Sequence, residues 1–156
     1  HFAIDAAEEE ARDRSNVAIA NAKLAYQEYK KIIASDRWQA LAAKGARVQR
    51  LLWASTSTKN PEYSDVMYVD ELIGPDTVNT LPPNTIEACA DHCDVASRIE
   101  TDVDAAQQVI GMLPELGIDL DQVMDELLEE GIDKFVKPFD TLMDSLITKV
   151  KQLSPA

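Results

Sequence analysis

Hydrophobic residues recur at helical spacing through residues 15–35, between Lys, Gln and Glu side chains. Ser15 or Asn16 is a suitable N-cap, because either side chain can accept a hydrogen bond from the free N–H groups of a first helical turn. The pattern therefore predicts a long, Ala-rich amphipathic helix, whose apolar positions are Val17, Ile19, Ala20, Leu24, Tyr26, Ile32 and Ile33.

A second, shorter helix is predicted for residues 36–45. Ser35 or Asp36 can begin it, and Gly45 is the usual type of residue just beyond a helix C-terminus. At helical spacing, Trp38 and Leu41 are expected to face inward.

Two short strands follow, each with its own helix. Residues 49–54 contain the apolar run LLWA, which fits a strand buried on both faces, as in a parallel sheet. Residues 64–74 predict a helix capped by Ser64 and closed by Gly74, and residues 77–81 predict a second strand. Pro83 or Asn84 then opens a further helix. Strand, helix, strand and helix in this order are typical of a parallel sheet.

The chain from residue 102 onward is predicted to be all-helical, with one helix over residues 102–117 and another capped by Asp119 or Asp121. Pro138 is expected to kink or restart the last stretch. Its apolar residues share one face at spacings of three and four: Ile132, Phe135, Val136, Phe139, Leu142, Met143, Leu146, Ile147, Val150 and Leu153.

Charge and hydropathy narrow the classes of partner. The chain has 15 basic and 28 acidic residues, a net charge of −13, which argues against nucleic acid or an anionic membrane as a partner. No apolar run approaches the roughly 20 residues of a membrane span, and no secretory signal is visible. A soluble cytoplasmic protein is expected. The start at His1, without Met, indicates a chain that begins inside a larger architecture or was trimmed there.

The two cysteines, Cys89 and Cys93, stand four apart with His92 between them. A metal site needs further ligands at suitable spacing, and the chain offers only His1 as a second histidine. Reduced thiols near a helix end are the favoured interpretation, and no metal or cofactor is expected.

The strand at residues 49–54 ends in ASTSTKN, where hydroxyl side chains precede Lys59. Hydroxyls and an ammonium group at a strand end can bind a phosphate group, and the same residues also suit an exposed turn before Pro61. The residues alone leave both interpretations open.

A longer stretch carries a family resemblance. The run LLWASTSTKNPEYSDVMYVDELIGPDTVNTLPPNTIEA, residues 51–88, resembles the corresponding stretch of the transaldolases, in particular their bacterial and cyanobacterial branch. The upstream run VAIANAKLAYQEYKKIIASDRWQALAAKGARVQR and the downstream runs DVDAAQQVIGMLPELGIDLDQVMDELLEEGIDKF and VKPFDTLMDSL resemble the same family. The similarity extends from about residue 16 to residue 153.

The resemblance implies a (β/α)8 barrel, in which a buried lysine forms a Schiff base with a ketose phosphate. Transaldolases move a dihydroxyacetone unit from sedoheptulose 7-phosphate or fructose 6-phosphate to an aldose phosphate. At 156 residues the chain is too short for a whole barrel. It is expected to be the C-terminal part, a helix-rich α/β fragment with two or three parallel strands, the possible third at residues 2–4.

On this model residues 1–156 are a single partial-barrel domain. Residues 15–101 are its late βα units, with strand seven at 49–54 and strand eight at 77–81, and residues 102–156 are a C-terminal helical cap.

The resemblance also implies a phosphate site. Ser55 matches the family's serine at the end of strand seven, and Lys59 stands where this branch has a basic residue able to neutralise a phosphate dianion. Ser57 and Thr58 can add hydroxyl donors. The predicted phosphate-binding residues are Ser55, Ser57 and Lys59.

Three positions depart from the family pattern. Leu51 replaces a proline, and Ser57 and Cys93 each replace a glycine. Ser57 is expected to crowd or reshape the loop. Cys93 is expected to cost about 1 kcal/mol if a positive-φ helix end is kept there. The family's phosphate-contacting arginine of strand six is not assigned to Arg12 or Arg14.

The resemblance places the Schiff-base lysine and the acid/base carboxylates on earlier strands, so no catalytic residue is assigned here. No other lysine has a strand context that would bury it: Lys23, Lys30, Lys31, Lys44, Lys134, Lys137, Lys149 and Lys151. An amine nucleophile needs a depressed pKa, usually from desolvation. The chain alone is therefore expected to be inactive.

Three hypotheses remain. The first is a transaldolase present as a fragment or as one piece of a split enzyme, with a sugar phosphate as substrate and a polypeptide carrying the N-terminal barrel strands as partner. The second is a non-catalytic helical module derived from a transaldolase and serving binding or assembly. The third, a generic acidic helical protein, ranks last because the residue 51–88 run is specific.

Overall fold

The computed structural model describes residues 14–153, with side-chain surroundings from Asn16 onward. The possible strand at residues 2–4 and Arg12 lie outside the described residues. The described chain forms two compact units, divided between Met112 and Leu113, and each is treated separately below. In the described residues no helix is long and apolar enough to cross a membrane.

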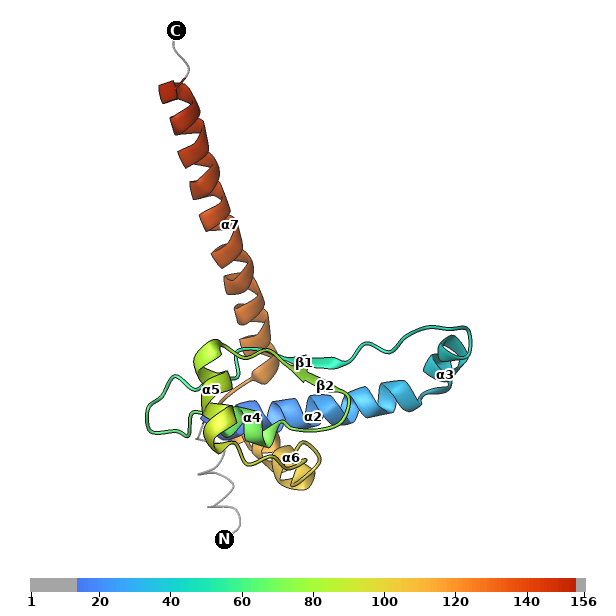
Figure 1. Ribbon diagram of the computed structural model, residues 1–156. Coiled ribbons are helices and arrows are strands. Elements are labelled where there is room, and N and C mark those ends of the chain that lie inside the picture. The colour runs from blue at the N-terminus through green and yellow to red at the C-terminus, as the bar shows by residue number, and fades with distance from the viewer. Residues whose placement is uncertain (1–13, 154–156) are drawn as a thin grey trace. The chain divides into compact units, whose positions relative to one another are not determined.

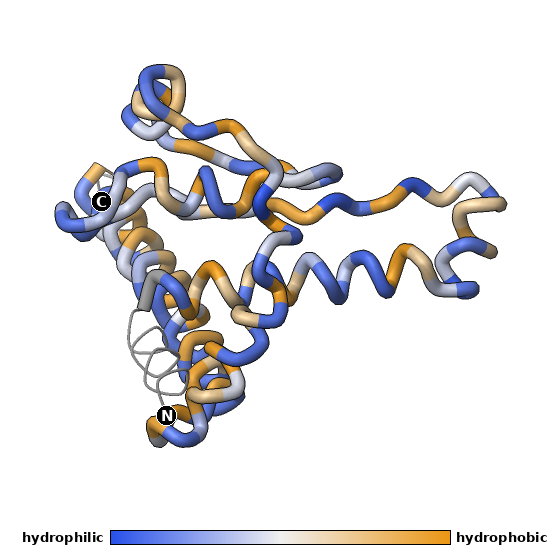
Figure 2. The backbone as a smooth tube through the Cα atoms, turned by 90° about the horizontal axis from the view of Figure 1, so that it is seen from below, coloured by the Kyte–Doolittle hydropathy of each residue, from blue (hydrophilic) through white to orange (hydrophobic). Residues whose placement is uncertain are grey.

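In the first unit the helix α2 runs alongside a short two-stranded sheet (Figure 1). Its elements in chain order are α2 (Arg14–Ala34), α3 (Asp36–Ala42), β1 (Leu51–Trp53), α4 (Met67–Glu71), β2 (Thr77–Asn79), α5 (Pro83–His92) and α6 (Val103–Met112). Hydrophobic and hydrophilic positions alternate along α2, as its sequence pattern predicts (Figure 2). Its buried side packs against α6.

The two strands pair in parallel, which confirms that prediction. Leu51 lies opposite Thr77, and Trp53 lies opposite Asn79. Both strands are shorter than predicted, with three residues each. Leu52 is 55% exposed between two half-buried neighbours, so the predicted burial of both faces is wrong for the described chain. One face of this sheet packs on the core, and the described residues leave the other face open at Leu52 while Val78 opposite it is half-buried.

The core of the first unit joins α2 to the sheet. Ile99 is fully buried together with Tyr26, Tyr29 and Leu72, and the half-buried hydrophobic side chains packed against this cluster are Ala22, Ile33, Leu51 and Trp53. The backbone N–H groups of Arg98 and Ile99 both donate to the carbonyl oxygen of Ile73, at 2.9 and 3.0 Å. These bonds fix the segment after α5 beside the end of α4.

One lysine contradicts the sequence prediction. Lys23 is only 5% exposed, because it follows Ile19 by one helical turn on the inward side of α2. Its Nζ donates to Glu71 Oε2 at 3.0 Å, and the carboxylate compensates the buried positive charge. The two residues are 48 apart in the sequence. Leu41, in contrast, is 44% exposed, so its predicted inward orientation is wrong; α3 has only seven residues and none of them is buried.

The helix ends follow the sequence in part. Ser35 caps α3, accepting from the N–H of Trp38 at 3.3 Å, and Pro83 begins α5. The predicted cap at Ser64 is wrong: its hydroxyl accepts weakly from Val66 N at 3.4 Å, and α4 begins only at Met67 because turns occupy the preceding residues. Cys93 has φ −60°, so the helix end does not need glycine there, and the predicted strain is absent.

The second unit contains η1 (Pro114–Leu116) and α7 (Leu120–Leu153). Gly117 follows η1 at φ 76°, a left-handed conformation that glycine adopts without cost. Asp119 caps α7, accepting from the N–H groups of Asp121 and Gln122 at 3.1 and 3.2 Å. α7 runs through Pro138 as one 34-residue helix, so the predicted restart is wrong. Its apolar side chains from residue 123 onward are exposed.

Candidate functional site

The candidate site is the loop that follows β1, and the end of β2 holds it at two points. The carbonyl oxygen of Trp53 accepts from the N–H and the hydroxyl of Thr80, at 3.0 and 3.2 Å. Three residues later, Thr56 donates through Oγ1 to Asn79 Oδ1 at 2.7 Å. Ser55 lies between these two attachments.

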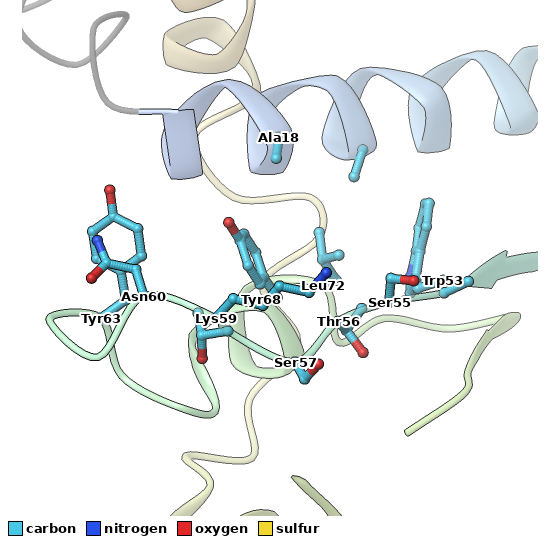
Figure 3. A pocket seen from close by; sticks show the side chains of 13 residues that line it. Ala18, Trp53, Ser55, Thr56, Ser57, Lys59, Asn60, Tyr63, Tyr68 and Leu72 are labelled. Atoms are coloured by element: carbon cyan, nitrogen blue, oxygen red, sulfur yellow. The ribbon is translucent and has the colours of Figure 1, made fainter. Parts of the chain in front are cut away.

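A cavity of about 440 Å³ lies between this loop and α2 (Figure 3). Its lining includes all three predicted phosphate-binding residues, Ser55, Ser57 and Lys59, so the structure brings them to one place. Ala18 and Ala22 of α2 form the opposite wall. The other lining residues are Trp53, Ala54, Thr56, Thr58, Asn60, Tyr63, Tyr68 and Leu72.

The serine hydroxyls and the ammonium group of this cavity are open to a ligand. Ser55 and Ser57 make no hydrogen bond, and Lys59 makes no ion pair, with any residue in the described part of the chain. Thr58, the additional donor suggested by the sequence, is already used: its hydroxyl donates to the carbonyl oxygen of Ser64 at 2.8 Å. Among the residues that the sequence proposes for phosphate, two hydroxyls and one cation are therefore available.

The backbone turns sharply at the first of these residues. Ser55 has φ 59°, a left-handed conformation that costs a residue with a side chain roughly 1–2 kcal/mol. Ser57, which replaces a family glycine, has no positive φ, so its backbone conformation is open to any residue. The backbone strain of this loop therefore lies at Ser55 and not at Ser57.

Sequence reasoning missed two contributors to this site. The Thr56–Asn79 hydrogen bond joins residues 23 apart, and Thr56 is only 4% exposed. Trp53 and Tyr68 give the cavity aromatic walls. The alternation of Leu52 and Trp53 along the strand could have indicated that Trp53 points to the helix side, whereas no local pattern marks the Thr56 contact.

A second polar cluster lies at the end of α5. His92 Nε2 contacts Asp65 Oδ1 at 2.8 Å, and Nδ1 contacts Asp91 Oδ2 at 3.1 Å. These bonds raise the pKa of His92, the one with Asp65 contributing most, and the same bond lowers the pKa of Asp65. The contact between His92 and Asp65 joins α5 to the last part of the loop between β1 and α4.

The two cysteines remain free thiols, both half-buried. Burial raises the pKa of Cys93 to about 12, and hydrogen bonding to Cys89 and Asp70 acts in the same direction. Within residues 14–153 no group of three or more His, Cys, Asp or Glu side chains is arranged to hold a metal ion.

Comparisons with known proteins agree on one family. The family model described as transaldolase/fructose-6-phosphate aldolase matches residues 2–146. The chain is 74% identical over 144 residues to "Transaldolase 2" of Nostoc sp., covering 91% of this chain and 38% of that protein. It is 69% identical to "Transaldolase" of Trichodesmium erythraeum over the same shares of the two chains.

A more distant relative extends the similarity beyond the cyanobacteria. "Transaldolase" of Saccharopolyspora erythraea is 49% identical over 140 residues, which cover 89% of this chain and 38% of that protein. The chain thus spans little more than a third of the length of the relatives it matches. A helix-rich α/β fragment with two parallel strands, matched by this family model over nearly its whole length, belongs to the transaldolase/fructose-6-phosphate aldolase family.

Proposed function

We propose that this chain is the phosphate-binding C-terminal part of a transaldolase. Such an enzyme is a cytoplasmic transferase of the pentose phosphate pathway that moves a dihydroxyacetone unit between sugar phosphates through a Schiff base. The observation that carries the proposal is the cavity beside β1, where Ser55, Ser57 and Lys59 come together. The ammonium group supplies one positive charge and the two hydroxyls supply hydrogen-bond donors, the kinds of group that bind a phosphate.

The position of this loop supports a barrel origin. Phosphate sites in (β/α)8 barrels are frequently built from the loops after the late strands, at the C-terminal face. In the proposed assignment β1 is strand seven and β2 is strand eight. Residues 15–101 are then the late βα units and residues 102–156 a helical cap, within one partial-barrel domain.

The residues that carry out the reaction, the chemical half of the site, are proposed to lie on the earlier strands of the barrel, outside this chain. Lys59 is the only lysine lining the cavity in the described chain, and its role there is electrostatic. Lys23 is buried, but its Nζ is bonded to Glu71 and it lines a different cavity. A polypeptide carrying the earlier barrel strands would supply the Schiff-base lysine and cover the exposed face at Leu52. No cofactor is required.

Isothermal titration of the chain with inorganic phosphate and with fructose 6-phosphate tests the phosphate half. Lys59→Ala removes one charge-assisted contact and is expected to weaken phosphate binding roughly ten- to a hundredfold. Lys44→Ala is the matched control, because Lys44 is also exposed and does not line the cavity. Equal phosphate affinity of the two variants would contradict the assignment.

Borohydride trapping tests the chemical half. The chain is incubated with fructose 6-phosphate, borohydride reduces any imine, and peptide masses locate the adduct. We expect no adduct on this chain alone, and an adduct on the second polypeptide when one carrying the earlier strands is added. An adduct on Lys23 or Lys59 would overturn the proposal that the catalytic amine is absent here.

One observation favours the second candidate, a transaldolase-derived module for binding or assembly. α7 carries a continuous row of exposed apolar residues, with Phe135 84% and Phe139 60% exposed, and such surfaces mark interaction sites. Sedimentation velocity separates the candidates. A chain that assembles on its own and binds no phosphate fits the module, whereas a phosphate-binding chain that needs the earlier strands fits the enzyme.

A further inference from the structure

We propose that Thr56 is a positioning residue, which holds Ser55 and Ser57 in the arrangement that binds phosphate. This inference rests on the proposed function above and adds a residue to that site. Thr56 is itself an unsuitable ligand, because it is only 4% exposed and its hydroxyl is bonded to Asn79. Its effect must therefore pass through its neighbours.

The first step is the strain at Ser55. A left-handed φ of 59° is unfavourable for serine, and such conformations persist only when the surrounding structure fixes them. The described contacts supply that fixation on both sides. Trp53 is held on one side through its carbonyl oxygen by Thr80, and Thr56 on the other side by Asn79.

The second step is geometric. Asn79 lies opposite Trp53 in the parallel pair of strands. Its side chain nevertheless bonds Thr56, which lies three residues beyond Trp53 in the sequence. With Trp53 and Thr56 both attached to the end of β2, the two residues between them have little freedom. The hydroxyl of Ser55 and the following Ser57 are then presented to the cavity without reorganisation when a ligand arrives.

The third step concerns what sets the binding energy. A loop that must be ordered by its ligand loses part of the interaction free energy to that ordering. Releasing Thr56 from Asn79 is therefore expected to weaken phosphate binding, although neither residue needs to touch the ligand. Lys59 would keep its charge, but the hydroxyls of Ser55 and Ser57 that bind the ligand with it would no longer be held in place.

The test measures the dissociation constant for inorganic phosphate by NMR titration of the whole chain. Thr56→Val keeps the shape and removes the donor, and is expected to weaken binding roughly five- to tenfold. Thr56→Ser restores the donor and should return the constant to within about twofold of the unmodified chain. Asn79→Ala should match Thr56→Val, and combining the two should add little, because both remove one bond.

Thr85→Val is the matched control. Thr85 is a threonine buried to the same extent, at 3% exposed, on α5 and outside the cavity. Its substitution is expected to lower stability without changing the phosphate affinity. Equal weakening by Thr85→Val, or unchanged binding by folded Thr56→Val, would overturn the positioning role alone. Failure of the unmodified chain to bind phosphate would overturn the proposed function, and this inference with it.

Discussion

Gly74 is the only one of the described glycines at which an added methyl group would meet other atoms within 4 Å. A Cβ built on Gly74 would lie 2.0 Å from Ile99 Cγ2 and 3.0 Å from Ile99 Cβ. Both distances are below ordinary van der Waals contact, and Ile99 is fully buried in the core cluster. Gly74→Ala therefore forces either residue to move.

The size of the effect depends on whether Ile99 can retreat. Its N–H group and that of Arg98 are bonded to the carbonyl oxygen of Ile73, the neighbour of Gly74, so the backbones on both sides of the clash are tied together. Overpacking a core typically costs about 1–3 kcal/mol. We expect Gly74→Ala to lower the free energy of unfolding by about 3 kcal/mol, the upper end of this range, because of those ties.

Urea denaturation followed by tryptophan fluorescence measures this change, since Trp38 and Trp53 both lie in the first unit. Gly111→Ala is the matched control: no atom lies within 4 Å of its added Cβ, and it stands within α6. It should raise the free energy of unfolding by at most roughly 0.5–1 kcal/mol, the value for a glycine in the middle of a helix, because Gly111 stands one residue before the end of α6.

A second-site variant checks the cause. Ile99→Leu removes the clashing Cγ2 while keeping the side-chain volume, so it should recover part of the stability lost in Gly74→Ala. A Gly74→Ala chain within about 0.5 kcal/mol of the unmodified chain, the scale of neutral surface changes, would refute the reasoning. Loss of stability without recovery by Ile99→Leu would place the cause elsewhere.

Two further predictions follow from the shifted pKa values. The pKa of His92 is raised, mainly by its bond with Asp65. While Asp65 is ionised, this contact stabilises the fold fully below the ordinary histidine pKa, and the stabilisation is lost as the pH rises through the raised pKa. NMR titration should show that Asp65→Asn lowers the pKa of His92, and an unchanged value would contradict the contact. The pKa of Cys93 is about 12, with Asp70 among the causes, so Cys93 should react slowly with iodoacetamide at pH 8 and faster in Asp70→Asn, as followed by peptide mass spectrometry.

The sequence was sufficient for features with a local pattern. Parallel pairing of residues 51–53 with 77–79 follows from two short apolar runs separated by a helix, and Pro83 marks the start of α5 through its fixed φ. The gathering of Ser55, Ser57 and Lys59 in one cavity follows from their place just after a strand.

Features that depend on distant partners were not predictable in this way. Lys23 shares the helical spacing of Ile19, but a lysine on that stripe is buried only because Glu71 lies within reach. The Thr56–Asn79 bond likewise depends on the loop after β1 meeting the last residue of β2.

The sequence pattern overestimates the helix-breaking effect of Pro138 in α7. The pair of Lys134 with Glu130 spans Gly131, and the pair of Lys137 with Asp133 precedes Pro138. Each pair contributes only about 0.2–0.5 kcal/mol, but the surrounding Leu, Met, Glu and Lys residues are strong helix formers. α7 therefore continues through Pro138, where the sequence predicts a kink or a restart.

The uninterrupted course of α7 through Pro138 has a consequence for how this helix opens. Proline has no N–H, so the carbonyl oxygen of Lys134, four residues earlier, loses its helical partner. The ladder of hydrogen bonds is thus divided near the middle, and the segments on either side can unzip as separate cooperative units. Amide hydrogens next to Pro138 should exchange with solvent through short-lived openings of the helix centre, while fraying from Leu120 and Leu153 proceeds independently at the two ends.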